Sequence, residues 1–377
     1  MRIREQYSIQ CRAVTHPADG APQSSATPWM PGETGDSNRR TSSSNQGEFM
    51  EMARSGKVSD PVRTDWAGDD HQWWDWYMTL ASQAPAESAD AVPDPERSVE
   101  IEAPEYEVHA SLAAPYALAE ESISFFRRNG YVRLRNMIPP SVVATLSRRV
   151  DELLDAMHGT GNDRRFLAVE QVWLIDPLVR GVTLSRRIGD VAAQLMGVEG
   201  VRLYHDNILS KEPGCGRTPW HRDHDHYPLA SPAVCTSWFP LQRIPAAMGT
   251  LTCLPRTSVP GSLLKIPVSV ENSSYDERVE AELRASGVVP DSSPFELGEV
   301  SFHAADCFHT AGPNRTGVPR RVLSSTYYAD GTNVTDSPTV LSGKWKDFLP
   351  GVAPGTLAVS SLNPLVGSTA ALVSARR

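Results

Sequence analysis

The chain has 377 residues, of which 40% are hydrophobic, and a formal net charge of -9 from 36 basic and 45 acidic side chains. This composition predicts one large or two ordinary globular domains with a buried core. The acidic balance, with no basic run to offset it, excludes nucleic acid as an expected partner. No apolar run approaches the roughly 18 residues of a membrane span, and the N-terminus lacks a secretory signal, so no membrane partner is expected. Five scattered cysteines without a CxxC pair favour the reducing cytoplasm.

The composition changes once, near residue 112. Residues 1–112 are rich in Ser, Pro, Gly, Asp and Glu, and we expect a mostly irregular or disordered extension. The exception is the Trp-rich segment 64–80, TDWAGDDHQWWDWYMTL, whose four tryptophans are costly to leave in water. We expect this segment to dock, either on the main domain or on a second subunit, so monomer and homodimer both stay open. Met50 and Met52 are kept as alternative starting residues.

Residues 113–377 are expected to form one continuous domain that begins with helices. A first helix should end at Asn129-Gly130, a favourable C-cap pair, and lead into a short strand through Val132 and Leu134. An apolar stripe predicts a second helix in PPSVVATLSRRVDELLDAM. A third helix, in SRRIGDVAAQLMG, should end at Gly197.

After this helix the pattern changes to short strands separated by Gly and Pro. The strand segments are VRLYHDNILSKEPG, TSWFPLQ, GTLTCLP, LLKIPVSV, GEVSFH and RRVLSSTYYADG. Helices followed by strands without intervening helices predict antiparallel sheets with the helices packed outside them. We therefore expect a mainly β fold with flanking helices, closed as a barrel or a double-sheet jelly roll.

The stretch TPWHRDHDHYP, residues 218–228, has three histidines and two aspartates in six consecutive positions. On a strand, side chains at i and i+2 share a face, so His221 and Asp223 should point together. A later strand should bring in His309 as a third ligand, and two histidines with one carboxylate form the facial site of non-haem Fe(II) oxygenases. Arg320 follows eleven residues after His309. Its guanidinium can hold a carboxylate through two hydrogen bonds, as an oxoacid cosubstrate requires.

From about Leu118 to Gly331 the chain resembles the phytanoyl-CoA dioxygenase family of Fe(II)- and 2-oxoglutarate-dependent oxygenases. The resemblance lies in FFRRNGYVRLRNMI, VRLYHDNILSKEPG, WHRD, GEVSFH and HTAGPNRTGVPRR, in that order. It implies a double-stranded β-helix that binds Fe(II), 2-oxoglutarate and O2. The roles it implies are iron ligands at His221, Asp223 and His309, a 2-oxoglutarate anchor at Arg320, a neighbouring Trp238, and further cavity contacts from His205, Asn207 and Lys211.

The chain departs from the family pattern at two places. It has PRTS at Pro255 to Ser258 where the family often has PGSH, which leaves the substrate loop undefined. It also has Ala311 two positions after His309, where the family has a small hydroxyl residue. This second change is expected to remove one hydrogen bond to 2-oxoglutarate.

The resemblance implies a dioxygenase that hydroxylates, desaturates or cyclises an aliphatic carbon of a small molecule, of secondary-metabolite or lipid-like character. Asp223 argues against halogenation, because related halogenases have Gly or Ala at that ligand position. Two alternatives stay open: a cupin-type metal enzyme that does not use 2-oxoglutarate, and a catalytically silent binding protein on the same barrel. His224 and His226 are expected to face solvent or to lie at the rim of the cavity. Arg321 is expected to form a structural ion pair on the face opposite Arg320.

Overall fold

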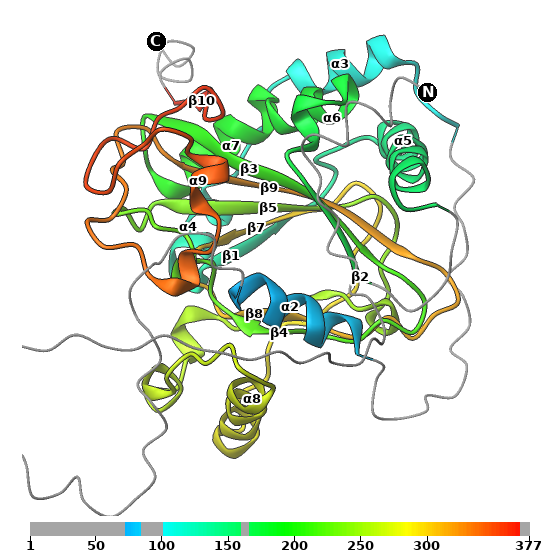
Figure 1. Cartoon of the computed structure of the whole chain (residues 1–377). Helices are drawn as coiled ribbons and strands as arrows, with labels where there is room; N and C mark the ends of the chain where they lie inside the picture. The colour runs from blue at the N-terminus through cyan, green and yellow to red at the C-terminus, as the bar shows by residue number, and fades with distance from the viewer. Residues whose placement is uncertain (1–71, 84–100, 160–165, 370–377) are drawn as a thin grey trace, which may run out of the picture. The chain divides into compact units, whose positions relative to one another are not determined.

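The computed structural model describes residues 72–83, 101–159 and 166–369. These residues form two antiparallel sheets with helices packed outside them (Figure 1). The large sheet has seven strands in the order β1-β7-β5-β9-β3-β10, with β2 also paired to β3, and the small sheet has the order β4-β8-β6. The large-sheet strands are β1 (Tyr131–Leu134), β2 (Phe166–Glu170), β3 (Gly200–Lys211), β5 (Val234–Pro240), β7 (Val300–Ala304), β9 (Arg320–Ala329) and β10 (Leu365–Ser368). The small-sheet strands are β4 (Thr218–His221), β6 (Leu251–Cys253) and β8 (His309–Ala311).

Helices cover the outer face of the large sheet. They are α3 (Glu105–Ala113), α4 (Glu120–Asn129), α5 (Pro140–His158), α6 (Pro177–Thr183) and α7 (Arg186–Met196), and a short α9 (Trp345–Phe348) precedes β10. Helix α7 lies on β3, β5 and β9, while α3 and α4 pack on α7. The close approach of β10 requires a glycine in α7, since a Cβ on Gly189 would lie 2.9 Å from the backbone nitrogen of Gly367.

The predicted helix ends are confirmed. Gly130 and Gly197 cap α4 and α7 in the left-handed conformation, with φ of 82° and 71°, which a residue with a Cβ adopts at a cost. At the other end of α7, the side chain of Ser185 accepts a hydrogen bond from the Ile188 N–H at 3.4 Å. These local signals were readable in the sequence because they depend on neighbouring residues only.

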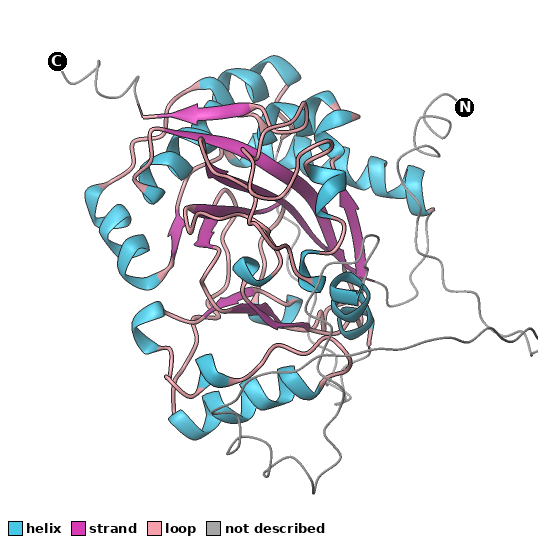
Figure 2. Ribbon diagram, turned by 60° about the vertical axis from the view of Figure 1, so that its left-hand side comes forward, coloured by secondary structure: helices cyan, strands magenta, loops and turns pink. Residues whose placement is uncertain are grey.

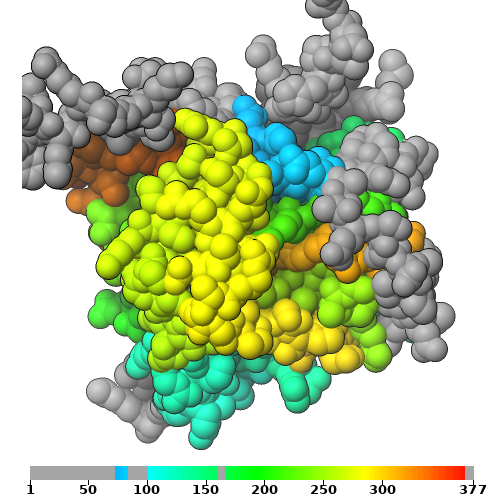
Figure 3. Space-filling view, turned by 90° about the horizontal axis from the view of Figure 1, so that it is seen from below, coloured from blue at the N-terminus to red at the C-terminus, as the bar shows by residue number. Residues whose placement is uncertain are grey.

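The small sheet is covered by α2 (Gln72–Ser82) and α8 (Ser274–Ser286), which lie side by side in the space-filling view (Figure 3). Trp73 and Trp76 of α2 are buried, and the Trp76 indole N–H donates to the carbonyl of Asn272 at 2.7 Å. The Trp-rich segment therefore docks on the chain's own small sheet over the part that is described. Trp66, the first tryptophan of the segment, lies outside the described residues.

The expected division at residues 112 and 113 stays a prediction. Residues 1–71 and 84–100 lie outside the described residues, and helix α3, Glu105–Ala113, runs across the expected boundary. The side chains of Val108 and Leu112 are buried, and α3 packs on α5, α6 and α7. The packed layer thus includes residues from both sides of position 112.

The fold is mainly β, with the two sheets facing each other inside the helices, as the order of elements predicted, and it is the double-stranded β-helix that the resemblance implied (Figure 2). Helix α8, between β6 and β7, interrupts the expected run of strands. The four described cysteines, Cys215, Cys235, Cys253 and Cys307, are free and buried, as expected for small core residues. Among the helices of the described ranges, none has the length and apolar character needed to cross a bilayer.

Candidate active site

Polar side chains form a row across the inner face of the large sheet. The strand register aligns His205 on β3, Thr326 on β9, Thr236 on β5 and His303 on β7. The Thr236 and Thr326 hydroxyls lie 3.0 Å apart, which shows that both point to the same face. Alternation along the strands then places Asn207 and Trp238 on this face two residues further on. The middle of the inner face of the sheet is therefore a polar floor.

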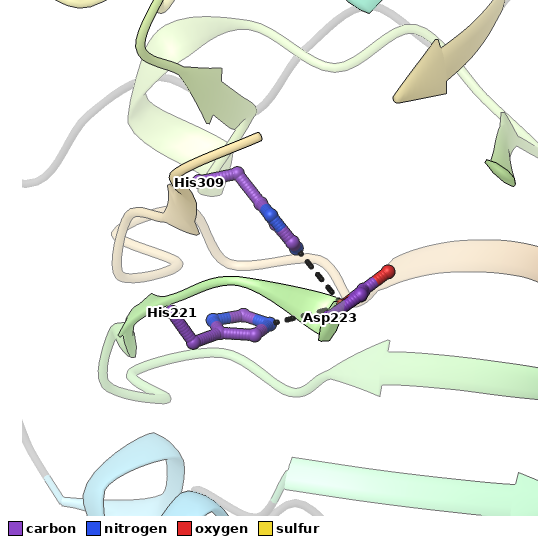
Figure 4. Close-up of side chains that lie close together, drawn as sticks. All are labelled: His221, Asp223 and His309. Carbon is purple, nitrogen blue, oxygen red and sulfur yellow. Dashed lines mark ion pairs between the residues drawn. The ribbon is translucent and has the colours of Figure 1, made fainter. Parts of the chain in front are cut away.

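Three potential metal ligands meet above this floor (Figure 4). One ligand atom each from His221, Asp223 and His309 lies within 4.8 Å of the others. The Asp223 Oδ1 atom is 3.7 Å from the Nε2 atoms of both histidines. Each histidine donates its Nδ1–H to a backbone carbonyl, His221 to Pro219 at 2.8 Å and His309 to Cys307 at 3.0 Å. Both Nε2 lone pairs therefore face the common centre, which is the tautomer that a metal site requires.

The second carboxylate oxygen of Asp223 is held from the floor. Thr236 donates its hydroxyl to Asp223 Oδ2 at 2.7 Å, and His303 Nε2 lies 3.4 Å from the same atom. The carboxylate is thus oriented with Oδ1 toward the two histidines and Oδ2 away from them. This orientation suits a carboxylate that binds a metal through one oxygen.

The electrostatics of the three groups suit a divalent cation. Burial lowers the pKa of His221, and burial together with His221 and His303 holds the pKa of His309 well below its usual range. Burial alone would raise the pKa of Asp223, but the neighbouring histidines His309 and His303 hold it well below its usual range. Neutral imidazoles beside an ionised carboxylate are the protonation states in which these side chains bind metal.

A buried guanidinium lies at another part of the barrel. Arg320, at the start of β9, is 1% exposed and stacks on Trp238, with 5.5 Å between the guanidinium carbon and the ring centroid. Its Nη1 atom donates to the Gly249 carbonyl at 3.0 Å, while Nε is buried without a partner. Burial lowers the pKa of Arg320 to about 10, so the group stays charged at neutral pH. Its free donor makes Arg320 a candidate anion site.

The face of β3 that was expected to line the cavity carries His205, Asn207 and Lys211. The Lys211 Nζ donates to three backbone carbonyls, of Gly216 at 2.8 Å, Ala311 at 2.9 Å and Gly312 at 2.6 Å. Lys211 therefore contributes charge to the region, and its hydrogen bonds hold the adjoining loops.

The other two β3 residues differ from Lys211 in their bonding. His205 Nε2 is 3.1 Å from the Tyr227 hydroxyl, which is in turn 3.0 Å from Thr326. Burial lowers the pKa of His205 to about 4, so its ring is neutral. Asn207 has a buried side-chain oxygen without a partner. On the same strand, His205 Nδ1 and Asp206 Oδ1 are also buried without a partner.

Aromatic rings from α2 lie directly against the candidate ligands. The Trp73 ring stacks on His226, with centroids 4.7 Å apart, and meets the His221 ring at 5.8 Å. The Tyr77 ring is edge-on to His221 at 5.3 Å. His226 is partly buried beneath Trp73, while His224 is exposed as expected. Helix α2 therefore forms one wall of the site.

Two expectations about local structure need correction. The segment LLKIPVSV, expected to be a strand, contains the 3-10 helix Leu263–Lys265 and no strand, and the shared strand face of His221 and Asp223 is the other. Strand β4 ends at His221, and Asp223 begins a short 3-10 helix, Asp223–Asp225, so the two residues do not share one strand face. They converge because the chain turns immediately after Arg222, which remains extended. As expected, a later strand brings in His309: it begins β8, which pairs directly with β4 at His221.

The expected role of Arg321 is confirmed. Its side chain faces away from Arg320 and forms ion pairs with Asp151 at 2.8 Å and Glu212 at 2.6 Å. Alternation along β9 is the reason for this separation.

Sequence reasoning missed His303, Thr236 and Tyr77. His303 ends the quoted segment GEVSFH, and strand alternation from the polar Ser301 was a usable signal for an inward-facing histidine. Thr236 carries no such signal, because a threonine in a strand is ordinary. Tyr77 reaches the site only through the docking of α2, which no local pattern predicts.

The chain matches the family model for phytanoyl-CoA dioxygenase (PhyH) over residues 126–322, more than half of its length. Two curated proteins are similar. The "Probable alpha-ketoglutarate-dependent hypophosphite dioxygenase" of Stutzerimonas stutzeri is 28% identical over 168 residues, which are 41% of this chain and 53% of that protein. The "Probable phytanoyl-CoA dioxygenase" of Caenorhabditis elegans is 22% identical over 243 residues, 56% of this chain and 76% of that protein. The chain thus spans about half the length of the first relative.

Solved structures share the fold. The carbocyclase SnoK from nogalamycin biosynthesis has a TM-score of 0.56 at 23% identity, and the match covers 67% of this chain and 99% of SnoK. EctD from S. alaskensis with 2-oxoglutarate and 5-hydroxyectoine has a TM-score of 0.51 at 17% identity, covering 74% of this chain and 97% of EctD. At these identities the likeness supports the double-stranded β-helix alone.

A jelly-roll barrel with two histidines and one carboxylate at its centre defines the class of non-haem iron oxygenases. Within that class, the chain belongs to the phytanoyl-CoA dioxygenase family. The curated relatives it resembles carry the names of an alpha-ketoglutarate-dependent dioxygenase and a phytanoyl-CoA dioxygenase.

Proposed function

We propose that the protein oxidises an aliphatic carbon of a small molecule, by hydroxylation, desaturation or ring closure, with His221, Asp223 and His309 as its iron ligands. The observation that carries this proposal is the convergence of these three side chains, with both Nε2 atoms 3.7 Å from one carboxylate oxygen. The donor set fits Fe(II), since two imidazoles and a carboxylate on one side of an ion leave positions for cosubstrate and oxygen.

Arg320 is the proposed anchor for the distal carboxylate of 2-oxoglutarate. Its charge, its burial and its unpartnered Nε–H suit a carboxylate, and Trp238 limits where the guanidinium can lie. Lys211 adds positive charge beside it, and Asn207 and His205 are the further proposed contacts of the cavity. Iron and 2-oxoglutarate bound by these residues would supply the activation of O2 that oxidation of an aliphatic carbon requires, with succinate and CO2 as coproducts.

The residues of this chain then have three tasks. Asp223, fixed by Thr236 and His303, keeps its ligating oxygen toward the metal position. The barrel and helix α2 exclude water, since His221, Asp223 and His309 are 5%, 5% and 6% exposed. Asp223 also fills the ligand position that halide would need, which supports oxidation over halogenation.

The substrate is proposed to be a secondary-metabolite or lipid-like small molecule. The solved neighbours, whose likeness extends to the fold alone, include a carbocyclase and an epimerase, so the barrel does not by itself select hydroxylation. Residues 113–377 are the proposed dioxygenase domain, with residues 1–112 as an extension. A cytoplasmic location, and a monomer or homodimer, complete the proposal.

The test is substrate-stimulated succinate formation, measured with Fe(II), 2-oxoglutarate and a panel of candidate metabolites under air. The expected result is succinate in proportion to an oxidised product that differs from its substrate by one oxygen or two hydrogens. His309→Ala is expected to give neither, and Arg321→Ala serves as a control that keeps the chemistry. Turnover without 2-oxoglutarate would establish the cupin-type alternative. Tight metal and 2-oxoglutarate binding without any turnover would favour a silent binding protein.

A further inference from the structure

Helix α2 extends from the candidate ligands to the candidate anion site. The Tyr77 ring meets His221 edge-on at 5.3 Å and Phe166 at 5.9 Å. His221 belongs to the small sheet and Phe166 to the large one, so Tyr77 lies between the two sheets. Tyr77 is therefore inside the barrel mouth and not on its surface.

The large-sheet side of this position is a row of three aligned residues. Phe166 pairs with Lys211 across β2 and β3, and Lys211 pairs with Arg320 across β3 and β9. The Tyr77 ring thus contacts this row at Phe166, and Arg320 lies at the other end of the same row. The Tyr77 hydroxyl is close to the Thr218 hydroxyl and interacts electrostatically with Arg320.

The row contains two buried cations without a carboxylate partner. Lys211 and Arg320 are 0% and 1% exposed, and the ion pairs found among the described residues include neither of them. Burial, and after it the nearby Arg320, hold the pKa of Lys211 well below its usual range, while its three carbonyl acceptors match the three donors of an ammonium group. A buried pair of this kind is stabilised by a bound anion.

Strand β8 brings no side-chain hydroxyl to this place at position 311. Ala311 occupies that position, and its backbone N–H and carbonyl lie 2.9 Å and 3.3 Å from the Thr218 hydroxyl. The Thr218 hydroxyl is thus engaged by the backbone at the place where Tyr77 arrives. A tyrosine side chain carries an O–H at neutral pH, so Tyr77 brings a hydrogen-bond donor to this place.

We propose that Tyr77 is a cosubstrate-binding residue, whose hydroxyl donates a hydrogen bond to the distal carboxylate of 2-oxoglutarate beside Arg320. The N-terminal helix thereby supplies the hydroxyl that Ala311 lacks. This inference rests on the proposed function, because it takes Arg320 as the anchor.

The test compares two oxoacids in one protein. Binding of 2-oxoglutarate and of 2-oxobutyrate, which lacks the distal carboxylate, is measured by calorimetry on the full chain loaded with Mn(II) under anaerobic conditions. Tyr77→Phe keeps the ring and its contacts and removes only the hydroxyl. It is expected to weaken 2-oxoglutarate binding by about 10- to 100-fold, as for a hydrogen bond to a charged group, and to leave 2-oxobutyrate binding unchanged.

Three further variants complete the design. Tyr275→Phe, a buried tyrosine of α8 beside Trp76, is the matched control and is expected to change neither affinity. Ala311→Ser in the Tyr77→Phe background is expected to recover part of the lost affinity. Arg320→Ala tests the anchor itself: unchanged 2-oxoglutarate binding in that variant contradicts the proposed function.

Each other outcome overturns the inference alone. If Arg320→Ala weakens binding and Tyr77→Phe does not, the anchor is correct and Tyr77 has no part in it. Tighter 2-oxoglutarate binding by Tyr77→Phe would show that the phenol competes with the cosubstrate. Equal loss of both oxoacids would show that the hydroxyl maintains the shape of the pocket and does not contact the carboxylate.

Discussion

Replacing Thr236 with valine tests how the floor of the barrel controls the metal site. The change keeps the side-chain shape and removes one hydroxyl, which donates to Asp223 Oδ2 at 2.7 Å in a position only 5% exposed. A hydrogen bond to a charged, buried group contributes about 1.5–3 kcal/mol. His303 remains 3.4 Å from the same oxygen, so we expect the lower end of this range, a loss of about tenfold in metal affinity.

The measurement is anaerobic Fe(II) titration, with Mn(II) as a redox-inert check. Thr145→Val is the matched control, because Thr145 also donates from a buried hydroxyl, to the Ala103 carbonyl at 2.7 Å, on a helix distant from the site. It is expected to lower stability to denaturant without changing metal affinity. Wild-type metal affinity in Thr236→Val would refute the view that Asp223 is oriented through its second oxygen.

The other predictions concern the cosubstrate, the ligand set and pH. Arg320→Ala is expected to raise the 2-oxoglutarate concentration needed for half-maximal succinate formation at least tenfold, with iron affinity nearly intact, and the same loss from Arg321→Ala instead would contradict the register. Asp223→Gly is expected to be nearly inactive and to give no chlorinated product in high chloride, as read from isotope patterns in mass spectra. Burial raises the pKa of Asp206 to about 8, so its ionisation opposes folding and wild-type stability should fall as pH rises from about 4 to 8. The free energy of unfolding of Asp206→Asn, measured in urea, should rise relative to that of the wild type by up to about 4 kcal/mol between pH 5 and pH 8, which is about 1.4 kcal/mol per pH unit. If the two free energies change with pH in parallel, the prediction of a raised Asp206 pKa is wrong.

The elements of the fold were predictable where they depend on short-range signals. The glycines at 130 and 197 end helices because they adopt a left-handed conformation, and this holds whatever packs against them. The order of helices and strands was enough to predict facing antiparallel sheets. The short 3-10 helix at Asp223–Asp225 was not predicted, since a turn of three residues has no periodicity to detect.

The candidate site was predictable to the extent that its residues are close in sequence or lie in ordered motifs. His221 and Asp223 are two positions apart, and His309 and Arg320 follow in one segment. Thr236 and Tyr77 were missed for a different reason: strand pairing brings one to Asp223, and docking of a distant helix brings the other to His221. Such contacts are tertiary, and a single sequence does not encode them in any local pattern.

Helix α2 lies outside the range that the family model matches, which begins at residue 126. The wall that α2 forms against His221 therefore comes from residues that the family model does not cover. Two relatives that align well over that range can differ in this wall. Phylogenetic trees calculated from an alignment of the shared range will group such chains by their metal site. Sorting them by the molecules they accept requires the residues that come before it.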